Sequence, residues 1–78
     1  MREKKDALII TFSTTAEAMK TEKYCEKNGF SGRLIPVPRE ITAGCGLAWK
    51  SAPQEMEQLP KKLSAAGIHW EEARILKI

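Results

Sequence analysis

The 78-residue sequence predicts a single α+β domain with the element order strand, helix, strand, strand, helix, strand. Two observations lead to this prediction: an apolar, β-branched run near the N-terminus, and two later segments with apolar residues at helical spacing, each followed by short strand-like runs. The order is that of ferredoxin-like folds, in which two helices cover one face of a four-stranded antiparallel sheet. A chain of this length leaves no residues for a second core, so residues 1–78 are expected to form one domain.

The first half of the chain predicts a buried strand followed by a capped helix. ALIITF, residues 7–12, is apolar or β-branched throughout, as in a strand at the centre of a sheet. Thr14 and Glu17 have the spacing of a capping box, which predicts a helix over residues 16–28. Cys25 lies on the apolar stripe of this helix, and we therefore expect it to pack in the core.

The second half predicts two short strands, a helix and a last strand. LIPVP, residues 34–38, is a strand that its prolines must end, and LAWKS, residues 47–51, is the next. Helical spacing and a proline near the start predict a helix within residues 53–67. Pro60 removes a hydrogen bond from that helix, so we expect a kink there or a separate first turn. The final strand lies within HWEEARILKI, residues 69–78.

The predicted fold leaves one sheet face partly open. We expect Trp49 or Trp70 to lie on that face, which could also support a homodimer. Tyr24 and the tryptophans are interpreted as core or interface residues, and no cofactor is expected.

Composition argues against two classes of partner. The net charge is +3, but the basic residues are spread along the chain and only five residues are aromatic, which disfavours nucleic acid binding. No apolar run approaches the roughly 20 residues of a membrane span. ALII, residues 7–10, is also shorter than the apolar region of a signal peptide. Two cysteines without an export signal predict free thiols in the cytoplasm.

The segment PREITAGCG, residues 38–46, carries the most unusual residue. Cys45 stands between Gly44 and Gly46, which allow the backbone to bend sharply and other molecules to approach the sulfur. Backbone N–H groups in such a turn can form a concavity that favours a thiolate. Arg39 could fold back and lower the pKa of the thiol further. The alternative is that Cys45 is a turn residue without a role.

Other thiol chemistry lacks its usual partners. Cys25 is twenty residues from Cys45, so a CxxC redox pair is absent, and His69 adds too few ligands for a metal site. His69 is the only histidine, and we interpret it as a structural residue at the start of a strand rather than as a catalytic base. The chemistry left to a lone thiolate is transfer of sulfur or selenium, with Arg39 and Glu40 as candidates for thiolate stabilisation and partner recognition. An exposed ion pair is the alternative for those two.

The same segment resembles the signature of the selenium/sulfur carrier-like family of small proteins. The matching residues are Pro38, Arg39, Glu40, Ile41, Cys45 and Gly46, followed by Leu47 and Ala48. The chain departs from the family pattern at Thr42, Ala43 and Gly44, where relatives usually carry serine; if those hydroxyls bind the carried atom, only Thr42 remains to do so. The predicted site is therefore Cys45 as nucleophile, with binding residues Arg39, Glu40, Thr42, Gly44 and Gly46.

The resemblance implies a carrier that holds sulfur or selenium on Cys45 as a persulfide or perselenide. A donor such as a cysteine desulfurase would load it, and an acceptor protein would unload it. Two alternatives stay open. One is a binding or regulatory module that uses the 38–46 segment, and the other is a redox sensor that forms a mixed disulfide or a Cys45–Cys45 dimer.

Overall fold

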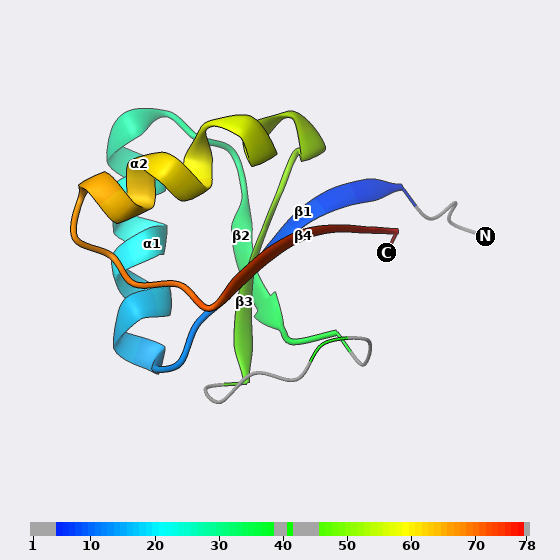
Figure 1. The fold of residues 1–78 in the computed structure, drawn as a ribbon, viewed down its shortest axis with the longest axis horizontal. Coiled ribbons are helices and arrows are strands. Elements are labelled where there is room, and N and C mark those ends of the chain that lie inside the picture. The colour runs from blue at the N-terminus through cyan, green and yellow to red at the C-terminus, as the bar shows by residue number, and fades with distance from the viewer. Residues whose placement is uncertain (1–4, 39–40, 42–45, 78) are drawn as a thin grey trace.

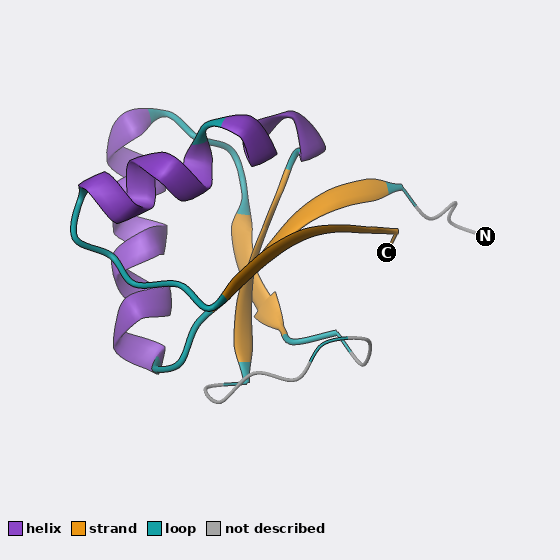
Figure 2. Cartoon of the chain, viewed as in Figure 1, coloured by secondary structure: helices purple, strands orange, loops and turns teal. Residues whose placement is uncertain are grey.

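The computed structural model describes residues 5–38, 41 and 46–77. These residues form a four-stranded antiparallel sheet in the order β2-β3-β1-β4, with both helices packed on one face (Figures 1 and 2). The elements are β1 (Asp6–Thr11), α1 (Thr15–Asn28), β2 (Arg33–Pro36), β3 (Leu47–Ser51), the 3-10 helix η1 (Pro53–Glu57), α2 (Leu59–Ala65) and β4 (Glu72–Lys77). The predicted ferredoxin-like α+β topology is confirmed.

β1 lies at the centre of the sheet because both of its edges are paired. Leu8 faces Ser51 of β3 on one side and Ile75 of β4 on the other. Every residue of β1 after Asp6 is buried, as the continuous apolar run predicts. Alternate side chains divide between the two faces, so that Leu8 joins the core beneath the helices whereas Ile9 joins a smaller cluster on the opposite face.

α1 begins and ends as its sequence indicates, with one difference. The Thr14 side chain accepts a hydrogen bond from the Glu17 backbone N–H at 3.3 Å, and Gly29 ends the helix with φ 75°. The Glu17 carboxylate bonds outside the predicted capping box: it accepts from the backbone N–H of His69 at 3.0 Å and from Lys20 at 3.3 Å. The first turn of α1 is thereby tied to the segment that leads into β4.

The second helical segment is divided, as Pro60 predicts. η1 ends at Glu57, and α2 starts at Leu59 with Pro60 in its first turn, where the missing N–H costs no intrahelical bond. Leu59 and Leu63 are fully buried against the sheet.

The prediction that a tryptophan lies on the open sheet face is wrong. Trp49 is 2% exposed in the core beneath the helices, because the register places it beside Ile10. Trp70 packs against the same core, and its indole N–H donates to the Pro60 carbonyl and to Ser64 Oγ, both at 3.0 Å. The helix-free face instead carries a small aliphatic cluster. Its members are Ala7, Ile9, Ile41 and Ala48, with Ile35, Val37 and Leu76 packed beside them.

Candidate functional site

Most of the predicted site lies outside the described residues. Arg39, Glu40, Thr42, Gly44 and Cys45 belong to this group, so their predicted roles stay predictions. Gly46 and the neighbouring Ile41 are described, and they show how the 38–46 segment is attached to the sheet.

The two ends of the segment are held together at its base. Pro36 and Leu47 form the last pair of the β2–β3 ladder. Beyond that pair, the backbone N–H of Val37 donates to the Gly46 carbonyl at 3.1 Å. The segment therefore leaves and rejoins the sheet at one point, where β2 ends and β3 begins (Figure 1).

Ile41 anchors the middle of the segment. It is 6% exposed and packs with Ala7, Ile9 and Ala48 on the helix-free face of the sheet. Its backbone N–H donates to the Pro38 carbonyl at 3.0 Å. The sequence analysis missed this role, although the signal is present, since Ile41 is the one large aliphatic residue between Val37 and Leu47. Burial of that side chain fixes the backbone four residues before Cys45.

Gly46 sets the direction of the chain directly after Cys45. Its φ is 75°, in the left-handed region that glycine adopts without strain. Among the described residues other than its chain neighbours, no atom lies within 4 Å of a Cβ built at this position, so the positive φ is the reason for glycine that this part of the chain shows. The chain turns at Gly46 and enters β3 at the next residue.

The start of α1 and the start of β4 lie at the same end of the sheet as Gly46 (Figure 1). Thr11 pairs with Ala48 of β3 and with Glu72 of β4, and its carbonyl accepts from the Glu71 N–H at 2.7 Å. His69 is exposed in the segment before β4, and its backbone N–H lowers the pKa of Glu17 by a hydrogen bond. Cys45 lies outside the described residues, so a contact between Cys45 and His69 is not tested.

Cys25 is a buried, free thiol in the core under α1, as its helical position predicts. Burial raises its pKa to about 11, and the negative charge of Glu55 contributes in the same direction. A thiol with that pKa is almost wholly protonated near neutral pH, and the protonated form is a poor nucleophile. Of the two cysteines in the chain, Cys25 is therefore a packing residue.

Within residues 5–38, 41 and 46–77, no group of three or more His, Cys, Asp and Glu side chains is placed to hold a metal ion. No helix in this part of the chain is long and apolar enough to cross a membrane.

The fold and the segment at its β2–β3 connection define a small ferredoxin-like α+β protein with a Pro-Arg-Glu-Ile and Cys-Gly signature. A family model described as "Putative Se/S carrier protein-like" matches residues 7–73, and the chain belongs to this family. The match runs from β1 into β4 and includes the whole 38–46 segment, as the resemblance implied. No curated protein and no solved structure matches the sequence.

Proposed function

We propose that the protein carries sulfur or selenium on Cys45 as a persulfide or perselenide. Two observations support this proposal: Cys25 is buried and protonated, which leaves Cys45 as the candidate carrier thiol, and the family match covers the segment that contains Cys45. Cys25 is buried with a pKa of about 11. Cys45 precedes a left-handed glycine in a segment whose ends are hydrogen-bonded together and whose Ile41 is packed on the sheet. The description of the family supports selenium or sulfur carriage, and the assignment of that role to Cys45 is part of the proposal.

Loading requires one exchange at sulfur. The Cys45 thiolate attacks the outer sulfur of a persulfide on the donor, a new S–S bond forms, and the bond between the two donor sulfur atoms breaks. The donor cysteine leaves as a thiolate, so the exchange needs no external oxidant or reductant. The same reaction in reverse, with an acceptor thiolate as nucleophile, unloads the carrier.

The remaining predicted residues take supporting roles in this proposal. Arg39 supplies positive charge that favours the thiolate, and Glu40 takes part in partner recognition. Thr42 offers a hydroxyl to the carried atom. Gly44 and Gly46 keep Cβ atoms away from both sides of the sulfur.

A cysteine desulfurase is the proposed class of donor, since it presents the required persulfide. An acceptor protein or enzyme would then take the sulfur or selenium from Cys45. We further propose that the protein without a carried atom forms a homodimer through the open sheet face.

The test is loading by a cysteine desulfurase supplied with free cysteine, followed by intact-mass spectrometry without reductant. We expect the wild-type protein to gain the mass of one sulfur atom, and peptide mapping to place it on Cys45. Cys25→Ala should load as the wild type does, and Cys45→Ala should not load. The two variants are matched because each removes one thiol.

Three results would contradict the proposal. Loading that survives in Cys45→Ala assigns the sulfur to another group. Absence of loading together with a Cys45–Cys45 disulfide under mild oxidation favours the redox sensor, and absence of both favours the binding module.

A further inference from the structure

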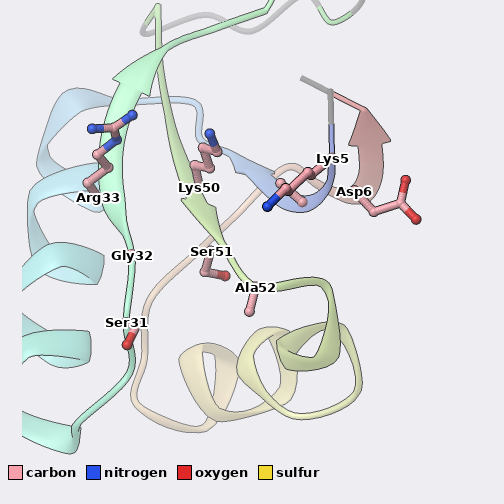
Figure 3. A pocket seen from close by; sticks show the side chains of 9 residues that line it. Lys5, Asp6, Ser31, Gly32, Arg33, Lys50, Ser51 and Ala52 are labelled. Carbon is pink, nitrogen blue, oxygen red and sulfur yellow. The ribbon is translucent and has the colours of Figure 1, made fainter. Parts of the chain in front are cut away.

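A cleft of about 460 Å³ lies at the end of β3 that is remote from Gly46, and Figure 3 shows the side chains that line it. It is formed where β1 and β2 begin and β3 ends, so three separate parts of the chain contribute to it. The residues that line it include Lys5, Asp6, Gly32, Arg33, Lys50 and Ser51. A volume in this range is typical of sites for small ligands.

The sheet register gathers positive charge at this cleft. Arg33 of β2 pairs directly with Lys50 of β3, so the two side chains project from the same face. Lys5 comes from the chain before β1, and its amino group is turned toward β3 in Figure 3. The only acidic lining residue is Asp6, whose carboxylate points away from the cleft in the same view.

The opposed pair of cations is unfavourable for the protein alone. Like charges directly opposite each other on neighbouring strands destabilise a sheet. Among the described residues, the ion pairs join Lys20 to Glu17 and Arg74 to Glu72, and neither Arg33 nor Lys50 has an acidic partner. A bound anion would supply the missing negative charge between them.

Two further residues shape the cleft. Ser51 is 7% exposed, and its buried hydroxyl has no hydrogen-bond partner within the described residues, but it pairs with Leu8 and therefore projects from the face opposite to Arg33 and Lys50. Gly32 brings the start of β2 against β3, because a Cβ there would lie 2.6 Å from the Lys50 carbonyl oxygen. The absence of a side chain at Gly32 therefore lets the chain directly before Arg33 lie close to the backbone of Lys50.

We propose that this cleft binds a small anionic ligand that carries a phosphate or diphosphate group, through Lys5, Arg33 and Lys50. Guanidinium and ammonium groups on separate strands match the several oxygens of a phosphate, and the cleft has room for one nucleotide-sized molecule. The cleft lies at the other end of β3 from Gly46, and the inference does not rest on the carrier function.

The test is a titration of the ¹⁵N-labelled full chain with pyrophosphate and with ADP, followed by amide chemical shifts. We expect saturable shifts at Gly32, Arg33 and Lys50, and none with adenosine, which lacks the phosphates. Arg33→Gln and Lys50→Gln should each weaken binding by about tenfold, since each removes a charge-assisted hydrogen bond. Lys62→Gln is the matched control, because it removes the same charge from α2, away from the cleft.

A second readout separates binding from a structural role. If the opposed cations are retained for a ligand, Arg33→Gln should raise the Tm of the free protein by on the order of a few degrees and remove the rise that ADP gives. If Lys62→Gln weakened ligand binding as much as Arg33→Gln does, the effect would come from net charge alone, and the proposal would be overturned. The absence of saturable shifts would also overturn it, as would a short single-stranded RNA that binds far more tightly than ADP at the same amides.

Discussion

At the residue scale, burial raises the pKa of Cys25. As a result, the free energy of unfolding falls as the pH rises in the alkaline range. The folded protein holds the Cys25 proton up to a pKa of about 11, whereas the ordinary value is 9.0. The unfolded chain therefore loses this proton first as the pH rises. The Cys25 contribution to the free energy of unfolding is complete below pH 9.0 and is lost as the pH approaches about 11.

Cys25→Ala should reduce this loss of stability. Urea denaturation of the wild type and of the variant, at several pH values across the window, measures the difference between them. Cys45→Ala is the control and should keep the wild-type profile. If Cys25→Ala also kept the wild-type dependence of stability on pH, the alkaline loss of stability could not be assigned to Cys25.

Gly32 provides a second test at this scale. Gly32→Ala should lower the free energy of unfolding by roughly 1–3 kcal/mol, because the new methyl group meets the Lys50 carbonyl and the Trp49 ring, both at 2.6 Å. Gly67→Ala is the control: its φ is 82°, but no atom of the described residues outside its chain neighbours lies within 4 Å of the added carbon. Denaturation should show the larger loss for Gly32→Ala, and equal losses would mean that backbone conformation alone matters at both positions.

At the scale of the elements, Ile41 joins the β2–β3 connection to the sheet. Ile41→Ala should destabilise the protein by about 2–4 kcal/mol through lost burial against Ala7, Ile9 and Ala48. It should also slow loading of Cys45 by the desulfurase, because the segment loses its attachment. Ile75→Ala, at a residue 39% exposed, is the control for loss of an isoleucine. Loading at the wild-type rate in folded Ile41→Ala would show that the anchor does not position the cysteine.

The hydrogen bond from the His69 backbone to Glu17 links α1 to the segment before β4. It predicts that the free energy of unfolding changes with pH in the acid range. The His69 backbone N–H holds the pKa of Glu17 below its ordinary value of 4.5. The Glu17 contribution to stability is therefore present above pH 4.5 and is lost as the pH falls through the lower, folded-state value. Glu17→Gln keeps an acceptor oxygen but no charge, and it should flatten the stability profile in this range. Thermal unfolding at a series of acid pH values would measure this, and an unchanged slope would contradict the link.

The elements that could be predicted from sequence are those set by local signals. The apolar run of β1, the Thr14 cap and Pro60 each act within a few residues, and the structure confirms all three. The side taken by Trp49 depends on strand register, which pairs it with Ile10, and a sequence pattern does not give that pairing. The Glu17 contact with His69 joins residues 52 positions apart, which is equally beyond a local pattern.

At the scale of the whole molecule, the sheet separates two regions of different chemistry. The 38–46 segment leaves the end where β3 begins, and the basic cleft lies where β3 ends. The signature residues around Cys45 could be recognised in the sequence because they are contiguous. The cleft could not, because Lys5, Arg33 and Lys50 are far apart in the chain and only the sheet brings them together.

The measurement that tests the central claim most directly is the pH dependence of iodoacetamide labelling at each cysteine, followed by peptide mass spectrometry. It needs neither donor nor acceptor protein, and Cys25 serves as the internal standard. We predict that Cys45 titrates well below the free-cysteine value of about 8.5 and reacts much faster than Cys25 at neutral pH. A Cys45 that titrates at or above that value, or reacts as slowly as Cys25, would contradict the carrier function.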